Sequence, residues 1–239
     1  MLNKENLDLL IVGSPNHLHL EHIQKGLEAG VTIFAEKPIV ANEEQTWQLA
    51  KLIKKYGKDK ILVIANRQKV PTMDPSIKYD ASTRTLQNGV YDALAKYVGS
   101  PPKVIPWLAK KWDVSADNKT YTFHLVKNAK FHNGDPVTAE AIRWSYARTL
   151  KLGKGPAWML NAFLKAENIK AVDKHTVSMT LDRAYGPFIS FVPWWYIMNP
   201  KTVMANEVDG DMGQKWMIEN EAGSGPYKLK RNQPGTLLE

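Results

Sequence analysis

The spacing of apolar residues changes partway along this chain, and its first part predicts alternating strands and helices. Residues 7–12 form a short apolar run before a Gly-Ser-Pro turn, a pattern typical of a buried strand. Asn16 is suited to cap a helix, and Ile23 and Leu27 recur four residues apart on one face. Gly30 is suited to end that helix, so we expect it to begin at Asn16 and stop there.

A second strand and a second helix follow at a similar spacing. Residues 31–35 predict a strand, Pro38 interrupts the chain, and Asn42 precedes a helix whose apolar face carries Leu49 and Leu52. Strand–helix–strand–helix units of this length have parallel strands joined by right-handed crossovers. The first part of the chain therefore predicts a partial doubly wound α/β unit.

A polar stretch separates this pattern from the rest of the chain. Residues 54–60 contain four lysines and a glycine, which predicts a linker. The apolar run 61–64 predicts a strand that, from its pattern alone, can belong to either side. We therefore expect two domains, over residues 1–58 and 59–239, with a boundary between residues 54 and 70.

After this boundary, turns, helices and short strands follow in a mixed order. The predicted elements are a Pro-containing turn over 70–75, a helix over 83–94, a strand over 121–126, a helix over 139–150 and a strand over 176–181. Thr138 is suited to cap the second of these helices, and a Gly/Pro turn at 223–227 leads into a further predicted strand. This order predicts a mixed α/β domain.

Composition narrows the class of protein. Hydrophobic residues make up 44% and charged residues 23% of the 239 positions, which is ordinary for a globular protein. There is no cysteine, so disulfides, thiolate metal sites and a cysteine nucleophile are excluded.

The positive charge is unevenly spread. The formal net charge is +8, and residues 1–58 hold seven lysines and seven acidic residues, so all of the excess lies after them. The later lysines and arginines are scattered, and no nucleic-acid-binding motif accompanies them. We read them as a solvated surface and expect no nucleic-acid partner.

The sequence predicts neither a membrane span nor a secretory signal. The longest apolar runs are far shorter than the ~18 residues that a transmembrane helix needs. The first residues are polar, and the run at 7–12 is too short for the apolar core of a signal peptide. On the sequence as written, we expect a cytoplasmic location.

Few residues are arranged for catalysis or metal binding. His17, His19 and His22 are two and three residues apart across a predicted turn, a spacing that does not bring ligands to one face, so no metal site is expected. No catalytic triad or Walker-type loop is present, and Asp113 and Asp117 are expected in turns.

One resemblance covers about the first 50 residues. The run Leu9-Leu-Ile-Val-Gly-Ser-Pro-Asn-His-Leu-His19, the run Gly26-Leu-Glu-Ala-Gly30 and the triplet Glu36-Lys-Pro38 resemble the Gfo/Idh/MocA oxidoreductases. The resemblance implies an NAD(P) cofactor, with Lys37 as the catalytic residue beside the nicotinamide. The residues that it implies at the cofactor are Pro15, Asn16, His19, Glu36, Lys37 and Pro38. The Gly-x-Gly-x-x-Gly turn that should precede this segment is not in the sequence.

A second and longer resemblance covers about 165 residues. Its motifs, in order, are Pro71-Thr-Met-Asp-Pro75, Val90-Tyr-Asp92, Pro106-Trp-Leu-Ala109, Trp112-Asp-Val-Ser115, Thr120-Tyr-Thr-Phe-His-Leu125, Lys130-Phe-His-Asn-Gly134, Pro136-Val-Thr-Ala-Glu140 and Gly223-Ser-Gly-Pro-Tyr227. Together they resemble the family 5 extracellular solute-binding proteins, which bind dipeptides and oligopeptides for ABC importers.

The second resemblance implies a two-lobed fold that closes on a ligand and then docks on an ABC permease. It implies a peptide or a related small solute as ligand, no cofactor, and a periplasmic or cell-surface location. The sequence corresponds to the first, mixed α/β lobe of such a periplasmic-binding-protein type II fold, and the second lobe is expected to be missing. The two resemblances together suggest a fusion.

Aromatic residues are the candidate ligand contacts, although packing in the core is the favoured alternative for each of them. The candidates are Trp107, Trp194, Trp195 and Tyr196. If Trp194 and Trp195 lie on a strand, one of them must face away from the core. We therefore predict a truncated peptide-binding component of an ABC transporter. The alternatives are a residual NAD(P)-dependent oxidoreductase and a fusion without function.

Overall fold

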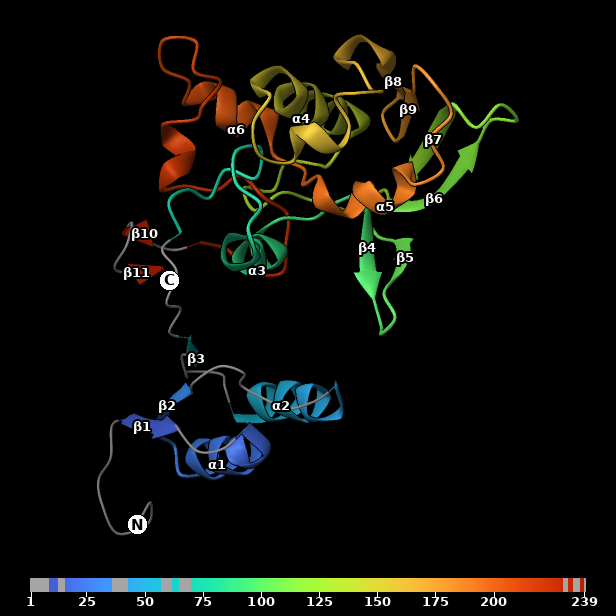
Figure 1. Ribbon diagram of the computed structural model, residues 1–239. Coiled ribbons are helices and arrows are strands. Elements are labelled where there is room, and N and C mark those ends of the chain that lie inside the picture. The colour runs from blue at the N-terminus through green and yellow to red at the C-terminus, as the bar shows by residue number, and fades with distance from the viewer. Residues whose placement is uncertain are drawn as a thin grey trace. The chain divides into compact units, whose positions relative to one another are not determined.

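The computed structural model describes most of the chain (Figure 1). The described residues are 9–12, 16–35, 43–56, 62–64, 70–229, 232–233 and 237–238. The chain divides into two compact units, residues 1–67 and residues 68–239. Each unit has its own core and is described by itself.

The first unit is a small parallel sheet with helices. Its elements are β1 (Leu9–Val12), α1 (Asn16–Glu28), β2 (Thr32–Ala35), α2 (Glu43–Tyr56) and β3 (Leu62–Ile64). The strand order is β1-β2-β3, and both neighbouring pairs are parallel. The predicted alternation of strands and helices is confirmed. The apolar run 61–64 was predicted to form a strand of either domain. It forms β3, which pairs with β2 and therefore belongs to the first unit.

A glycine allows α1 to pack closely on the sheet. A Cβ at Gly26 would lie 2.3 Å from Cδ1 of Ile33 and 2.8 Å from Cδ2 of Leu10. A larger residue would require these two terminal methyl groups to shift, so the glycine in the helix interior allows close packing. Ile23 and Leu27, predicted on one face, are buried.

The second unit is built around an antiparallel sheet with the strand order β6-β7-β9-β8. Its strands are β6 (Ala109–Val114), β7 (Thr120–Leu125), β8 (Ile169–Asp173) and β9 (Thr176–Thr180). The two outer strands are each irregular: the register shifts between Ala109 and Lys111 in β6, and between Ala171 and Asp173 in β8. A separate antiparallel pair consists of β4 (Ala95–Val98) and β5 (Lys103–Pro106).

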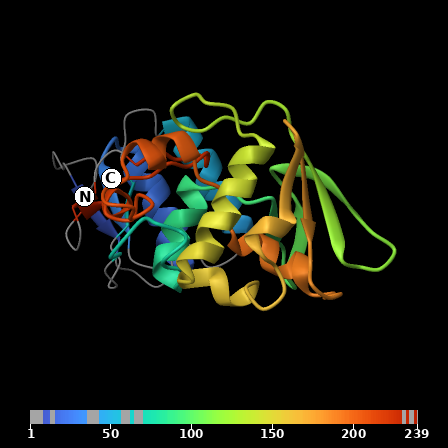
Figure 2. The ribbon, with the colours of Figure 1, turned by 90° about the horizontal axis from the view of Figure 1, so that it is seen from above.

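Helices and short turns complete the second unit. They are α3 (Ala81–Val90), α4 (Ala139–Leu152), α5 (Phe188–Phe191), α6 (Pro200–Ala205), and the 3₁₀ turns η1 (Gly155–Met159), η2 (Ala166–Asn168), η3 (Val192–Trp194) and η4 (Trp216–Ile218). The short strands β10 (Asn232–Gln233) and β11 (Leu237–Leu238) pair with each other. Figure 2 shows α4 running alongside the strands, and it contacts β8 and β9.

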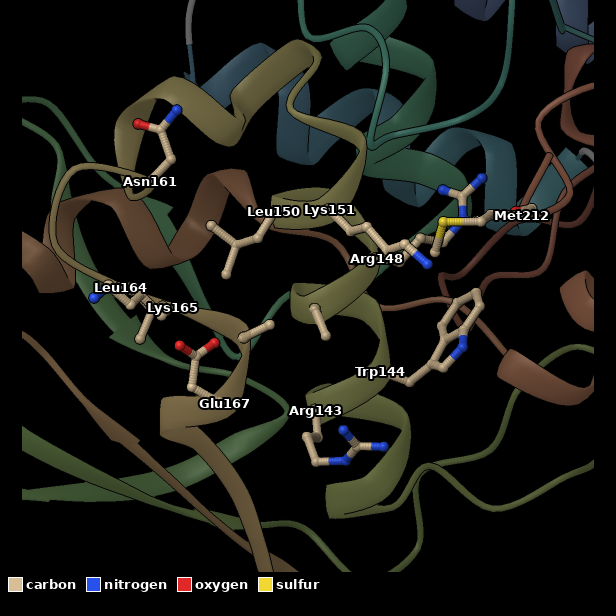
Figure 3. Close-up of a pocket in the computed structure, with 12 residues that line it drawn as sticks. Arg143, Trp144, Arg148, Leu150, Lys151, Asn161, Leu164, Lys165, Glu167 and Met212 are labelled. Carbon is tan, nitrogen blue, oxygen red and sulfur yellow. The ribbon is translucent and has the colours of Figure 1, made fainter. Parts of the chain in front are cut away.

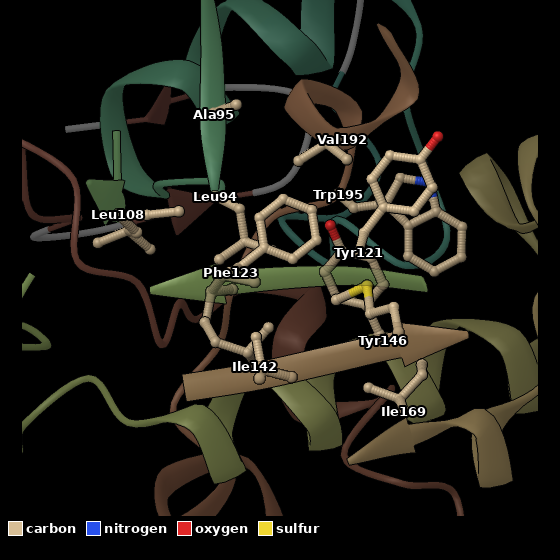
Figure 4. Packing of buried hydrophobic residues seen from close by; sticks show 14 of the residues in the cluster. Leu94, Ala95, Leu108, Tyr121, Phe123, Ile142, Tyr146, Ile169, Val192 and Trp195 are labelled. Atoms are coloured by element: carbon tan, nitrogen blue, oxygen red, sulfur yellow. The ribbon is translucent and has the colours of Figure 1, made fainter. Parts of the chain in front are cut away.

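The core of the second unit joins the sheet to α4 and to the segment after α5. Figure 4 shows Tyr121 and Phe123 of β7, Ile142 and Tyr146 of α4, and Trp195 gathered in one cluster. Alternate residues of β7 are buried, as the sequence pattern predicts for a strand with one covered face. Burying such aromatic and aliphatic side chains contributes about 1.5–3 kcal/mol each.

The predicted cap of α4 is confirmed. The Thr138 side chain accepts a hydrogen bond from the backbone N–H of Ala141, and Gly153 ends the helix in the left-handed conformation with φ of 63°. The N-cap of α3, Asp80, was not predicted; its carboxylate accepts a hydrogen bond from the Thr83 N–H.

The end predicted for α3 is wrong. The helix stops at Val90 and not at residue 94, because the chain there pairs with a distant segment. The N–H groups of Gly225 and Tyr227 donate to the carbonyl oxygens of Val90 and Gly89. These tertiary bonds compete with continuation of the helix, and the apolar spacing up to Leu94 reflects burial in the core. Residues 221–229, where a strand was expected to begin, form no regular strand.

Asp113 is also placed differently from its prediction. It lies in β6, where its carboxylate is 2.6 Å from Nε2 of His124 and 3.6 Å from Nζ of Lys111. The hydrogen bond from His124, with the charge of Lys111, lowers the pKa of Asp113. Asp117 lies in a turn, as expected, and accepts hydrogen bonds from Ser115 and the Lys119 N–H.

A buried ion pair attaches the segment before α3 to α4. The Arg148 guanidinium donates from Nη1 and Nη2 to the two carboxylate oxygens of Asp74, at 2.9 and 2.7 Å. Both side chains are fully buried. Arg148 also donates from Nε to the Met212 carbonyl oxygen, and Asp74 accepts from the Ser76 N–H. This pair therefore ties Asp74, in the segment before α3, to α4.

Candidate ligand-binding site

The cofactor residues predicted in the first unit are mostly outside the described part of the chain. This holds for Pro15, Glu36, Lys37 and Pro38. Asn16 begins α1, and the His19 side chain is 1% exposed. His19 is the one predicted cofactor residue whose side chain is described, and the dinucleotide site stays a prediction.

Two of the four predicted ligand contacts lie in the core. Trp195 is 2% exposed, and its ring stacks on Tyr146 with the centroids 4.9 Å apart. Tyr196 is 7% exposed, and its hydroxyl donates to Oδ1 of Asn88. The prediction for this segment assumed a strand, but residues 192–194 form the 3₁₀ turn η3. The side chains of Trp195 and Tyr196 are therefore both buried.

Trp107 is exposed but engaged with its own surroundings. Its indole Nε1–H donates to Asp92 at 2.6 Å, and the Lys96 ammonium lies 3.3 Å from the ring centroid. The other Asp92 carboxylate oxygen accepts from the Ser224 hydroxyl. Trp107 is therefore held at the start of the β4–β5 pair by specific contacts.

Trp194 lies in a group of side chains whose proximity was not predicted from the sequence. Cζ of Arg84 is 3.3 Å from its ring centroid, a cation–π contact. The Tyr79 ring meets it edge-on, with centroids 6.4 Å apart and planes at 78°. Trp158, which is 58% exposed, donates from Nε1 to the Tyr79 hydroxyl at 3.0 Å.

We call Tyr79, Trp158 and Trp194 the aromatic surface. Its members come from the segment before α3, from η1 and from η3. They are far apart in the sequence and share no motif, so pattern analysis gave no reason to group them. The sequence contains one weak indication that Trp158 is exposed. It lies two residues after a Gly-Pro pair, which favours an exposed turn.

A glycine holds two members of the aromatic surface together. Gly155, the first residue of η1, has φ of +50°. A Cβ there would lie 2.7 Å from the carbonyl carbon of Ile77 and 2.9 Å from the carbonyl oxygen of Ser76. The close approach of η1 to residues 76–77 therefore requires glycine, and it places Trp158 beside Tyr79.

The surroundings of Arg84 are uncharged and partly desolvated. Burial lowers the pKa of Arg84, and burial raises the pKa of the nearby Tyr196 to about 12. The phenol of Tyr196 is therefore neutral at ordinary pH, while a guanidinium keeps its charge. The aromatic surface is thus backed by one positive charge.

A separate hollow of about 490 Å³ lies beside α4 (Figure 3). Its lining includes Trp144, Leu150 and Leu164, with charged groups around them. Most of these charges are already paired: Arg143 with Glu140, Lys165 with Asp182, and Arg148 with Asp74. The hollow therefore offers an apolar floor without a distinctive polar anchor, and we do not place the ligand there.

The arrangement at the aromatic surface suits binding. Flat, partly exposed rings stack on planar groups such as peptide bonds or other rings, and the guanidinium adds a charge. Within the part of the chain that the structure describes, no group of three or more acidic or histidine side chains could hold a metal ion. None of the described helices is both long and apolar enough to cross a bilayer.

Comparison with known sequences identifies the second unit. Residues 103–239 match the family of bacterial extracellular solute-binding proteins, family 5, in its middle region. This match covers more than half of the chain, and the chain therefore belongs to this family. Residues 1–64 match the oxidoreductase family with an NAD-binding Rossmann fold, Gfo/Idh/MocA. The two resemblances drawn from sequence motifs are confirmed.

Curated relatives share the same family. A probable D,D-dipeptide-binding periplasmic protein, DdpA of Escherichia coli, is 38% identical over 184 residues, covering 74% of this chain and 35% of its own. The dipeptide-binding protein DppE of Bacillus subtilis is 33% identical over 224 residues, covering 85% of this chain and 39% of its own. The chain thus spans somewhat more than a third of these relatives' length.

Solved structures confirm the mixed α/β lobe. The substrate-binding domain of an oligopeptide ABC transporter from Bacillus anthracis matches with a TM-score of 0.61 and 29% identity, over 70% of this chain and 34% of that one. AgaA of A. tumefacien R10, solved with agropinic acid, matches with a TM-score of 0.59 and 28% identity, over 70% of this chain and 32% of that one.

Proposed function

We propose that the second unit binds a short peptide or a related small solute, as part of the binding component of an ABC importer. The observation that carries this proposal is the aromatic surface of Tyr79, Trp158 and Trp194, displayed on a family 5 fold. Relatives whose names specify dipeptides support peptides as the ligand class. By the same membership we propose that it works in the periplasm or at the cell surface, and by binding, with no cofactor.

In this proposal the ligand packs against the aromatic surface. A peptide plane or ring replaces water over the exposed Trp158 ring and beside the partly buried Trp194 ring, and each such contact is worth about 0.5–1.5 kcal/mol beyond area burial. Main-chain and water-mediated hydrogen bonds then complete the contacts without strict side-chain specificity. Trp107 is not part of the aromatic surface: its indole N–H donates to Asp92 and its ring contacts Lys96.

The test is thermal unfolding of the purified chain with and without a pool of di- and tripeptides. A ligand that binds only the native state raises the midpoint in proportion to its occupancy. We expect a rise with the pool, and a loss of about tenfold in affinity for both Trp158→Ala and Trp194→Ala. The control is Trp47→Ala, an exposed tryptophan of the first unit, which should behave like the wild type. A midpoint unmoved by any peptide would contradict the proposal.

The second candidate is a nucleotide-binding role for the first unit. The observation that favours it is the parallel β1-β2-β3 sheet with its helices, in a segment that matches an NAD-binding Rossmann family. In doubly wound folds, loops at the carboxyl ends of such strands bind the cofactor. In the same thermal assay, an unfolding midpoint that rises with NAD(H) or NADP(H) but not with peptides would favour this candidate. Lys37 is then the residue to substitute first.

A further inference from the structure

Arg84 differs from Arg143 and Arg148, the two arginines of the second unit that form ion pairs. Its Nη2 donates weakly to the Pro193 carbonyl oxygen, at 3.5 Å, and its Nη1 is buried without a hydrogen-bond partner. By contrast, Arg148 and Arg143 each donate two hydrogen bonds to a carboxylate. Within the described residues, Arg84 forms no ion pair.

No nearby group supplies the missing negative charge. Asp80, one turn earlier on the chain, already accepts from the N–H and the hydroxyl of Thr83 and pairs with Lys78 at 3.4 Å. The polar groups facing Arg84 are the phenol groups of Tyr97 and Tyr196, and neither is a carboxylate. A half-buried guanidinium without an anion is costly, because burial removes water that the protein does not replace.

The position of Arg84 links this charge to the proposed ligand site. Its guanidinium lies against the Trp194 ring, which is itself part of the aromatic surface. Charges in such partly desolvated places are screened less than charges on open surface. An anionic group of a ligand at Trp194 would therefore be attracted over several ångströms without a preformed hydrogen bond.

We propose that the ligand bound at the aromatic surface carries an anionic group, a carboxylate, close to Trp194, and that Arg84 selects for it. This rests on the proposed function and narrows its ligand class to peptides with a free carboxylate, or other organic acids with a planar group. Arg84 acts here as a specificity-determining residue, while Tyr79 and Trp158 supply stacking that is indifferent to charge.

The experiment compares two probes that differ only in charge: the tripeptide Ala-Phe-Ala as its free acid and as its C-terminal amide. Binding to the full chain is measured by isothermal titration calorimetry. We expect the acid to bind about tenfold tighter than the amide to the wild type, with the difference shrinking in high salt. Arg84→Gln should remove this preference, and Arg84→Lys should keep most of it.

The matched control is Arg143→Gln, which removes an equal charge from the exposed face of α4 and should leave the preference unchanged. Circular dichroism verifies that each variant is folded. If Arg84→Gln does not fold, the Arg84→Lys variant still provides a test. Equal binding of acid and amide to the wild type, or a preference that survives in Arg84→Gln, would overturn the inference alone. Failure of both probes and of the wider peptide pool would overturn the proposed function instead.

Discussion

At the scale of single residues, two arginines of the second unit differ in how their charge is compensated. Arg148 is fully buried and meets Asp74 through two parallel hydrogen bonds, so its charge is compensated inside the fold. Arg84 lies against Trp194 without such a partner. The same side chain thus serves as a structural link in one place and leaves charge available for a ligand in the other.

Asp74→Asn should strongly destabilise the second unit. The substitution leaves the Arg148 guanidinium buried without a compensating charge, which costs about 3–5 kcal/mol in the free energy of unfolding. Urea denaturation followed by tryptophan fluorescence measures the loss. The double variant Asp74→Leu with Arg148→Met should lose less than the sum of the two single variants. A single variant within about 1 kcal/mol of the wild type would show that the pair is dispensable.

Glu140 provides a test of the pH dependence. Its hydrogen bonds from Arg143 hold the pKa of Glu140 below its usual range. A carboxyl whose pKa is lower in the folded state stabilises the protein above its unfolded pKa, and this contribution disappears as the pH falls through the folded pKa. In an NMR titration we expect Glu140 to titrate below an unperturbed glutamate, and we expect Arg143→Met to raise its pKa. An unchanged titration in that variant would contradict the assignment.

At the scale of elements, turns held by glycine decide where the aromatic side chains lie. The turn η1 can approach residues 76–77 only because Gly155 has no Cβ, and this approach brings Trp158 to Tyr79. The elements themselves are ordinary, but the contact between them depends on a position that carries no side chain. The aromatic surface is therefore sensitive to changes outside its own three residues.

Gly155→Ala should destabilise the second unit by about 1–3 kcal/mol and weaken peptide binding. It introduces both an unfavourable positive φ and a clash with Ile77. Gly153→Ala is the matched control, because Gly153 has a similar φ of +63° but open space around its Cβ position. The difference between the two melting midpoints measures the clash alone. Equal midpoints would show that η1 can shift at no cost.

At the scale of the whole molecule, the two units have separate cores. Ile23→Ala in the first unit removes buried methyl groups, which costs about 2–5 kcal/mol. In hydrogen-exchange mass spectrometry we expect faster exchange in residues 16–56, with protection in residues 120–180 unchanged. Leu164→Ala, in the core of the second unit, should give the reverse pattern. Loss of protection in both regions from either variant would contradict the separation.

Much of the fold was predictable, because local signals agreed with the final packing. The period-2 burial of β7 and the Thr138 cap of α4 are both readable from the sequence. The end of α3 was not, because bonds from Gly225 and Tyr227 override the local apolar spacing. The aromatic surface was missed for a related reason. Only Trp194 was a predicted contact, and its neighbours Tyr79 and Trp158 are brought to it by tertiary structure.

The irregular outer strands of the sheet in the second unit have a consequence for solubility. A regular outer strand offers unpaired backbone groups on which another chain can add a strand and begin to aggregate. Here β6 and β8 each have a register shift, and each carries lysine, at Lys110, Lys111 and Lys170. Both borders of the sheet are thus poor templates for intermolecular strand addition. Removing the register shift and the lysines from either outer strand should therefore promote self-association of the chain.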